Sequence, residues 1–111
     1  MSEISFDEWK KIKMVVGKIE NVERVPRTEK LYKLKVDIGA GKQTQVVTSL
    51  VPYYSQEELR GMKIIILTNL KPAKFAGEVS EGMLLCAEKE DGSACVLLTV
   101  QRDVDVGTPI T

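Results

Sequence analysis

The sequence predicts an all-β fold. Between residues 32 and 38 the apolar side chains alternate with two lysines and an aspartate, which is the two-residue period of a half-buried strand. Residues 14–25 and 63–68 are rich in Val and Ile, which favour strands. With 111 residues, of which 43% are hydrophobic, the chain is long enough for one core and too short for two, so we expect one domain over residues 1–111.

Two capping boxes predict two short helices. A serine precedes a glutamate by three residues at 5–8 and again at 55–58, so each serine can accept a hydrogen bond from the backbone at a helix start. The first box predicts a helix over about residues 6–11. The second predicts a single helical turn that stops at Gly61.

The remaining segments complete a barrel pattern. We expect strands over residues 14–25, 32–38, 43–49, 63–68, 83–87 and 94–100, and a last extended segment at Val104 and Val106. Gly17 inside the first strand indicates a β-bulge. Residues 69–81 form a loop of about a dozen residues, a length that usually accompanies function. Three strands, a short helix and two strands are the element order of the five-stranded OB-fold barrel, so the final strands are additional to it.

A net charge of zero conceals a segregation of charge along the chain. Residues 10–74 carry 14 Lys and Arg against 6 Asp and Glu, a net of +8, while the two flanks carry 2 against 10, a net of −8. Charge blocks in a sequence need not become patches on a surface. The pattern therefore leaves two interpretations open, a basic surface for nucleic acid and scattered solvated charge.

The chain offers no catalytic arrangement. It has no histidine, which excludes histidine-based acid–base catalysis and histidine metal ligation. Its serines lack a histidine base, its acidic residues form no close pair in an apolar setting, and its glycines match no phosphate-binding loop. We expect a protein that is not an enzyme and that needs no cofactor and no metal.

The cysteines and the apolar segments indicate the cell compartment. Cys86 and Cys95 fit a reducing compartment and could face each other across a hairpin, so we expect buried free thiols rather than a disulfide. The longest apolar run, residues 64–67, is far shorter than a bilayer span, and the first residues lack the features of a signal peptide. The expected location is cytoplasmic, with no membrane partner.

Two adjoining stretches carry a family resemblance. Residues 69–77 have the sequence Asn-Leu-Lys-Pro-Ala-Lys-Phe-Ala-Gly, and residues 79–87 contain Ser-Glu-Gly-Met. This pattern resembles the tRNA-binding domain found at the C-terminus of some methionyl-tRNA synthetases, in stand-alone bacterial tRNA-binding proteins and in accessory proteins of eukaryotic synthetases. Matching blocks at residues 16–19, 30–39 and 61–63 extend the resemblance over almost the whole chain.

Three positions depart from the family pattern. Val15 stands where the family usually has arginine, Val25 stands where it has histidine, and Thr48-Ser49 replaces a common serine-glycine pair. The first two departures remove possible tRNA contacts. We therefore expect an auxiliary grip on tRNA rather than a tight one.

The resemblance implies a dimeric OB-fold that grips the outer corner of folded tRNA without reading its sequence. The tRNA-binding candidates are Asn69, Lys71, Lys74, Ser80, Met83, Lys33, Lys35 and Phe75. Amide, ammonium and hydroxyl groups can bond phosphate or ribose oxygens, while a thioether or an aromatic ring can pack on a base. The scarcity of aromatic residues, 5% of the chain, favours a folded RNA over a single strand.

Structural interpretations of the same residues stay open. Asn69 could cap its own turn, Ser80 could bond its own loop, and Met83 could belong to the core. Phe75 could anchor the loop instead of stacking on a base. The two strand lysines could simply be solvated, because an outward lysine is common on any barrel.

The function that these observations favour is non-catalytic, structure-selective tRNA binding by a homodimer, auxiliary to methionyl-tRNA synthetase. Phe6 and Trp9 share one face of the first helix, and this face with the additional C-terminal strands is the expected dimer surface. Two alternatives are an export-related, chaperone-like dimer that binds polypeptide and a structural docking subunit of a synthetase complex. The absence of arginine at Val15 favours the last.

Overall fold

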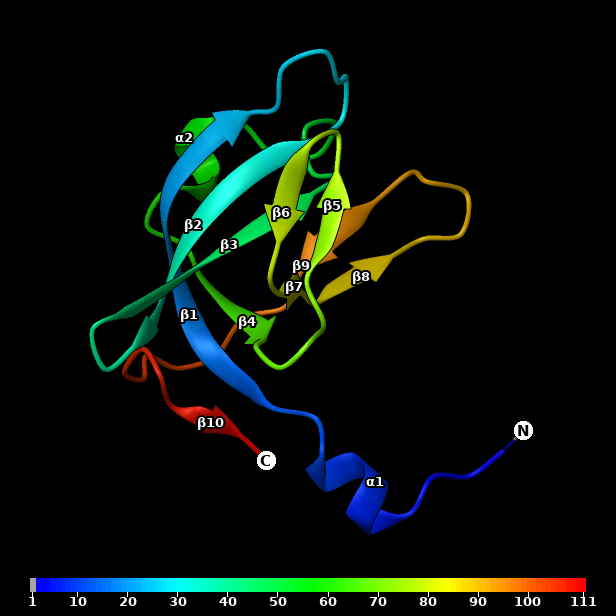
Figure 1. The fold of residues 1–111 in the computed structure, drawn as a ribbon, viewed down its shortest axis with the longest axis vertical. Coiled ribbons are helices and arrows are strands. Elements are labelled where there is room, and N and C mark those ends of the chain that lie inside the picture. Colours follow the sequence, from blue (N-terminus) through cyan, green and yellow to red (C-terminus); the bar gives the residue numbers. More distant parts are fainter. Residues whose placement is uncertain (1) are drawn as a thin grey trace.

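The computed structural model describes residues 2–111, whose strands form one curled main sheet and two hairpins beside it (Figure 1). In chain order the elements are α1 (Phe6–Lys10), β1 (Met14–Arg24), β2 (Tyr32–Gly39), β3 (Lys42–Thr48), α2 (Gln56–Leu59), β4 (Lys63–Leu67), β5 (Ala73–Phe75), β6 (Glu78–Ser80), β7 (Met83–Leu84), β8 (Cys86–Glu88), β9 (Cys95–Leu97) and β10 (Pro109–Ile110). The main sheet has the order β3-β2-β1-β4-β7, and β10 pairs with β1. The predicted all-β, OB-type fold with additional C-terminal strands is confirmed.

The long strand β1 holds the barrel together. Its first half pairs with β4 and its second half with β2, so that Gly17 lies opposite Ile64 and Ile19 lies opposite Val36. The barrel closes on the far side, where the Glu81 N–H donates to the carbonyl of Gln45 on β3 at 2.8 Å. Inward side chains are fully removed from solvent in the centre, as expected for a close-packed core.

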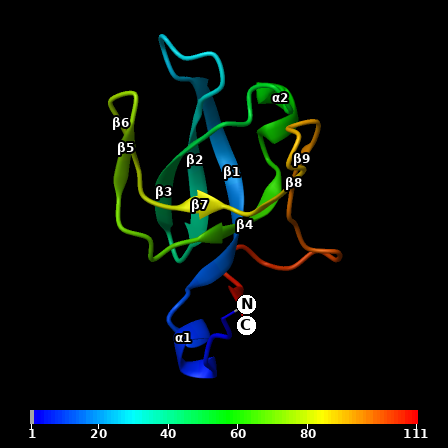
Figure 2. The ribbon, with the colours of Figure 1, turned by 90° about the vertical axis from the view of Figure 1, so that its right-hand side faces the viewer.

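Both helices begin as the sequence predicts, but only one of them belongs to the core. Ser5 and Ser55 each accept a hydrogen bond from the backbone N–H three residues on, and both capping boxes are complete. Leu59 of α2 is fully buried, so this helix closes one end of the barrel. Helix α1 has no buried residue and lies outside the barrel, near β10 (Figures 1 and 2).

The predicted bulge at Gly17 is wrong. The pairing of β1 with β2 shifts register between Ile19 and Asn21, so the bulge lies at Glu20. Gly17 serves a different purpose, because a Cβ atom there would lie only 2.8 Å from Cγ1 of Val36. The glycine therefore allows close packing of β1 against β2, a tertiary demand.

The expected long loop over residues 69–81 contains a hairpin instead. Strands β5 and β6 pair with each other, and Ala76 and Gly77 connect them with positive φ angles of 52° and 83°. Two successive positive φ angles characterise the tight turns whose twist matches that of paired strands. The part of the loop that lacks regular structure is thus restricted to residues 69–72 and 81–82.

The C-terminal third also differs from expectation. The predicted strand over residues 83–87 divides into β7 and β8, because Leu85 bonds β4 while the next residues turn to pair with β9. Val104 and Val106 form no strand. The carbonyl of Val104 instead accepts a hydrogen bond from the Lys63 ammonium at 2.7 Å, and the last strand is β10.

Candidate nucleic-acid interface

The β5–β6 hairpin presents the candidate loop residues. It is fixed to strand β3 through β6, since the Gln45 side-chain amide donates to the carbonyl of Val79 at 2.7 Å and the Val47 N–H donates to Oγ of Ser80 at 3.0 Å. All three residues of β5 are exposed. The hairpin is therefore anchored to the sheet through β6, while its outer strand, β5, is open to a partner.

Lys71, Lys74 and Phe75 lie on this open surface. All three are exposed, and 43% of Phe75 is accessible to solvent. The ion pairs found within residues 2–111 involve Lys33 and Lys63 but neither Lys71 nor Lys74. Two unpaired ammonium groups and one aromatic ring are thus available to phosphate and base at the same place.

Asn69 connects this surface to the segment that precedes β1. Its side-chain Oδ1 accepts a hydrogen bond from the Lys13 N–H at 3.0 Å, and its Nδ2 donates to the carbonyl of Lys11. Both ends of the amide are occupied by backbone, so the geometry gives Asn69 a positioning role. It brings Lys11 and Lys13, which are exposed, beside the loop that carries Lys71.

Lys11 and Lys13 were missed by reasoning from the sequence. The sequence does contain a group of lysines there, at positions 10, 11 and 13, at the start of the basic segment. Their relation to the candidate loop was not visible, since 56 residues separate Lys13 from Asn69 in the chain. We include both lysines in the candidate interface, which we call the lysine cluster: Lys11, Lys13, Lys71 and Lys74.

The two strand lysines are occupied by neighbours. Lys33 donates to Glu78 at 3.2 Å and lies 3.6 Å from a carboxylate oxygen of Glu23, while Lys35 donates to Gln45 at 2.6 Å. The hydrogen bond to Glu78 is the largest cause that raises the pKa of Lys33 above its ordinary value. Both lysines are half-buried and help to hold the hairpin on the sheet, so they contribute less free charge than the lysine cluster.

Ser80 and Met83 have different environments. Ser80 is buried, and its hydroxyl accepts from Val47 and donates to the carbonyl of Gly82 at 3.1 Å. This geometry matches the structural interpretation, so we leave Ser80 out of the contact surface. Met83 is 51% exposed and does not belong to the core, which leaves its thioether available to a partner.

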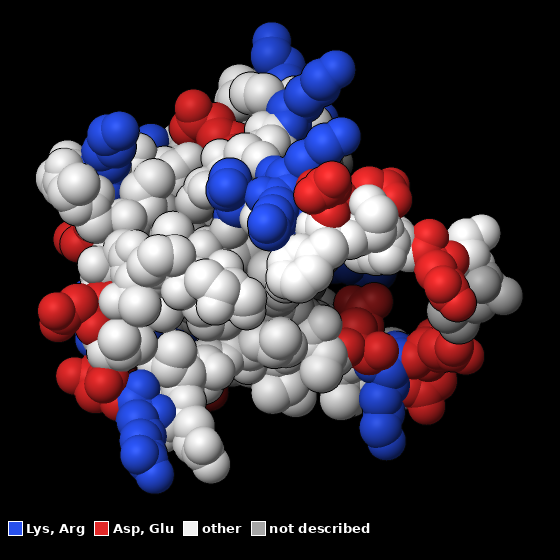
Figure 3. Space-filling view, turned by 90° about the horizontal axis from the view of Figure 1, so that it is seen from below, with Lys and Arg blue, Asp and Glu red and all other residues white. Residues whose placement is uncertain are grey.

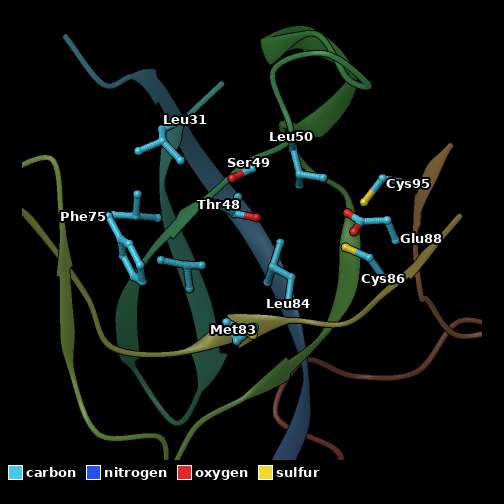
Figure 4. A pocket seen from close by; sticks show the side chains of 12 residues that line it. Leu31, Thr48, Ser49, Leu50, Phe75, Met83, Leu84, Cys86, Glu88 and Cys95 are labelled. Carbon is cyan, nitrogen blue, oxygen red and sulfur yellow. The ribbon is translucent and has the colours of Figure 1, made fainter. Parts of the chain in front are cut away.

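A cavity of about 260 Å³ opens between the β5–β6 hairpin and the β8–β9 hairpin. Figure 4 shows Phe75 on one side of it, Met83 at its floor, and Cys86, Glu88 and Cys95 on the other side. Both cysteines are free thiols, as expected. Burial is the largest cause that raises the pKa of Cys86 to about 12, and the neighbouring Cys95 and Glu88 raise it further.

Charge is distributed unevenly over the surface. Figure 3 shows the largest group of Lys and Arg at the top of the view, with further ones at the lower edge. Asp and Glu are most numerous on the right, where the β8–β9 hairpin lies, and others line the left edge. The tip of that hairpin contributes the exposed residues Glu88, Glu90 and Asp91. A mostly uncharged area lies between the two groups, at the end of the molecule formed by α1 and β10.

Exposed apolar side chains surround α1. Phe6 is 72% exposed, Trp9 37% and Ile12 41%. A hollow of about 510 Å³ separates this helix from β10, and another of about 620 Å³ separates it from the β7–β8 segment and Leu98. Exposed apolar side chains grouped in this way make the face of α1 a candidate protein contact. None of the helices in residues 2–111 is long and apolar enough to cross a bilayer.

The comparisons with known proteins identify the family. Residues 14–109 match the model of the "tRNA binding domain" family. This chain belongs to that family. It is 42% identical over 110 residues to a methionine–tRNA ligase of Methanocaldococcus jannaschii and 44% identical over 108 residues to that of Archaeoglobus fulgidus. These matches take in 99% and 97% of the chain but only 17% and 16% of the two ligases.

Solved structures that resemble this chain have the same fold and a similar length. A MetRS-related protein from Pyrococcus horikoshii superposes with a TM-score of 0.92 at 41% identity, and the match covers all of both chains. The chaperone CsaA from Bacillus anthracis superposes with a TM-score of 0.88 at 25% identity, over 99% of this chain and 100% of that one. The structural neighbours of this chain are therefore described in two ways, as related to a synthetase and as a chaperone.

The three departures from the family pattern occupy different environments. Val25 is buried and Val15 is half-buried beside β10, where it pairs with Pro109. Thr48 and Ser49 line the cavity between the two hairpins. Val15 lies two residues from Lys13 of the lysine cluster and lines the same hollow as that lysine, whereas Thr48 and Ser49 change the wall of a candidate binding site.

Proposed function

We propose that this chain binds folded tRNA by contacting the phosphate backbone of the RNA and recognising its shape, and that the chain catalyses no reaction. The observation that carries the proposal is the lysine cluster, in which the amide of Asn69 joins two segments that are far apart in the sequence. Ammonium groups that are not paired with carboxylates can neutralise phosphates, and the release of counterions then favours binding. Membership of the tRNA binding domain family supports tRNA as the RNA.

Recognition by shape rather than by sequence follows from the side chains available. Lysines position a protein on phosphates and carry no sequence information. Among the described residues of the hairpin, Phe75 is the single aromatic side chain, whereas binders of single strands stack successive bases on several rings. A rigid arrangement of charges around one hairpin suits a folded RNA whose phosphates are already in place.

The proposal is tested with fluorescently labelled tRNAs and a single-stranded RNA of the same length. We expect several tRNAs to bind with similar affinity, and the logarithm of the affinity to fall linearly with the logarithm of salt concentration. The single strand should bind more weakly. Equal affinity for the single strand would contradict shape recognition, and an affinity that salt does not change would contradict the lysine cluster.

We also propose that the chain acts as a homodimer through the face around α1. Phe6 and Trp9 are exposed next to two apolar hollows, and a partner chain that filled these hollows would remove apolar surface from water. A dimer would present two lysine clusters to one tRNA. Two linked sites bind more tightly than one, which would offset the contacts missing at Val15 and Val25.

The partner that this proposal favours is methionyl-tRNA synthetase. The matched segment forms part of a longer chain in the two ligases, where it is covalently joined to the rest of the enzyme. A separate tRNA-binding chain could supply tRNA to such an enzyme by raising its local concentration, in the cytoplasm where aminoacylation takes place. Copurification from the native host, with RNA and protein both identified, tests this partner.

Polypeptide binding is a second candidate function. Two structural neighbours are described as CsaA chaperones, and the exposed apolar side chains around α1 could bind an unfolded segment. A competition assay with labelled tRNA distinguishes the two functions. Bulk tRNA should displace labelled tRNA while a denatured protein should not, and the reverse result would favour the chaperone.

A further inference from the structure

The cavity between the hairpins has the size of a small, flat ligand. Its volume of about 260 Å³ lies below the range of about 300–1,000 Å³ that is typical of pockets for drug-sized molecules. It is built by segments from five places in the chain: Leu31 before β2, the end of β3 with the residues after it, β5, β7 and the β8–β9 hairpin. These segments leave room for one ring system.

Two side chains offer surfaces on which such a ring can pack. Phe75 and Met83 are 43% and 51% exposed, and both line the cavity (Figure 4). An aromatic ring stacks on the face of a nucleobase, and a flexible thioether adapts to its edge. Leu84 and Leu50 complete the apolar part of the lining, so a base would exchange water contacts for apolar ones.

Three polar side chains of the lining have no partner within the molecule. The hydrogen bonds and ion pairs of residues 2–111 include none made by the side chains of Thr48, Ser49 or Glu88. The Glu88 carboxylate points into the cavity from the side opposite Phe75 (Figure 4). A mostly apolar pocket with a few convergent polar groups is the usual form of a specific binding site.

We propose that this cavity receives one unpaired base of the bound tRNA and prefers guanine. The inference rests on the proposed function and deepens it. An ionised carboxylate only accepts hydrogen bonds, and it accepts two in parallel. Guanine presents two adjacent donors, N1–H and N2–H, on its Watson–Crick edge. Adenine, cytosine and uracil each place an acceptor next to their donor, which a carboxylate repels.

The charges around the cavity favour this orientation of a nucleotide. At the tip of the β8–β9 hairpin Glu90 and Asp91 outnumber the single cation Lys89, so the tip repels phosphate, while Lys74 on the other side attracts it. The sugar and phosphate therefore stay at the β5 side, and the base points toward Glu88. Phe75 lines the cavity and Lys74 does not, because successive side chains of a strand point to opposite faces, so Lys74 attracts the phosphate outside the cavity while the base stacks on Phe75.

Titration of the intact chain with mononucleotides, followed by nuclear magnetic resonance of the backbone amides, tests the proposal. We expect 5′-GMP to shift the amides of Thr48, Ser49 and Glu88 and to bind about tenfold more tightly than 5′-AMP, 5′-CMP or 5′-UMP, which is within the range for a bidentate base contact. Glu88→Gln should abolish this preference, since an amide replaces one acceptor with a donor. Glu57→Gln, at an exposed glutamate of α2 outside the cavity, is the matched control and should keep the preference.

A second variant separates stacking from selection. Phe75→Leu should weaken binding of all four nucleotides and leave their order unchanged, because it removes the ring but not the carboxylate. Equal binding of 5′-GMP and 5′-AMP, or a guanine preference that survives Glu88→Gln, would overturn the base pocket. So would a denatured polypeptide that shifts the cavity amides when 5′-GMP does not.

The same variants distinguish this inference from the proposed function. If labelled tRNA binds and weakens with Lys71→Ala while 5′-GMP shows no preference, the base pocket fails and tRNA binding stands. If 5′-GMP binds selectively but tRNA does not bind, the tRNA function fails, and the guanine site is not one for tRNA. A modest loss of tRNA affinity on Glu88→Gln, with none on Glu57→Gln, supports both.

Discussion

The side chain of Asn69 accepts a hydrogen bond from the backbone N–H of Lys13, across 56 residues of chain and over 3.0 Å. The same side chain donates to the carbonyl of Lys11, so one amide holds the segment between α1 and β1 against the β4–β5 loop. Through these two hydrogen bonds, Asn69 helps to determine how lysines from two segments are arranged. In the proposed function, Asn69 acts on tRNA through the lysines whose backbone it holds.

Asn69→Ala tests this positioning role. The substitution leaves two exposed backbone groups to bond water, so the free energy of unfolding should fall by only about 0.5–1.5 kcal/mol. Affinity for tRNA should fall several-fold, because Lys11 and Lys13 lose their fixed place beside Lys71. Hydrogen exchange should quicken at the Lys13 amide. Asn21→Ala, which removes an exposed asparagine of β1, is the control, and tRNA binding lost without faster exchange would make Asn69 a direct contact instead.

Lys71→Ala tests the lysine cluster itself. Loss of one exposed ammonium that contacts phosphate should weaken binding of every tRNA by about 1 kcal/mol. The slope of log affinity against log salt concentration should also become shallower by about one. Lys42→Ala removes an equally exposed lysine from the β2–β3 turn, away from the hairpin, and should change neither quantity. Measurement of affinity over a series of salt concentrations checks both variants. An unchanged slope for Lys71→Ala would remove the loop from the interface.

The dimer face can be tested with two matched substitutions of phenylalanine by serine. Phe6→Ser should convert a dimer, of twice 12.4 kDa, into a monomer, because Phe6 is 72% exposed in the single chain and has little of its own core to lose. Phe75→Ser makes the same chemical change on the β5–β6 hairpin and should leave the mass unchanged. Light scattering after size exclusion at low concentration gives both masses. A monomeric parent chain would remove the dimer from the proposal.

Local patterns in the sequence were sufficient for most of the fold. Both capping boxes form because their hydrogen bonds join residues only three apart, and strand β2 follows the alternation of its side chains. The hairpin over residues 73–80 was missed because each of its strands has three residues, too few to establish a period. The bulge was placed at Gly17 because a glycine permits several roles, and only the approach of Val36 decides between them.

The candidate site was predictable only where a residue acts alone. Lys71 and Lys74 are exposed and unpaired, as a loop of small residues around a proline suggests. Lys33 and Ser80 have the chemistry of RNA contacts, but their partners, Glu78 and Val47, become neighbours only after the hairpin folds onto the sheet. Pairing of this kind depends on tertiary structure, so a pattern of residue types does not reveal it.

The thiol of Cys86 gives a prediction that depends on pH. Burial, with smaller contributions from Cys95 and Glu88, raises its pKa from 9.0 to about 12. At pH 8 the thiolate fraction should therefore be roughly a thousandfold smaller than that of the same thiol in the unfolded chain. The thiolate is the reactive form, so alkylation of Cys86 by iodoacetamide should be slow in the folded protein and fast in urea. In the Cys95→Ser variant the serine hydroxyl still offers Cys86 a hydrogen-bonding partner. Cys86 is then the single thiol, so the alkylation rate that is measured belongs to Cys86.

The same pKa sets the direction in which stability changes with pH. Between pH 9 and 12 the unfolded chain loses a proton that the folded chain keeps, so the free energy of unfolding should decrease as pH rises through this range. Below pH 9 this group should have no effect. Urea unfolding measured from pH 8 to 9.5 gives this dependence. Cys86→Ser, whose hydroxyl does not ionise, should give a flatter profile, and an equal decrease in both proteins would mean that the folded thiol ionises as readily as the unfolded one.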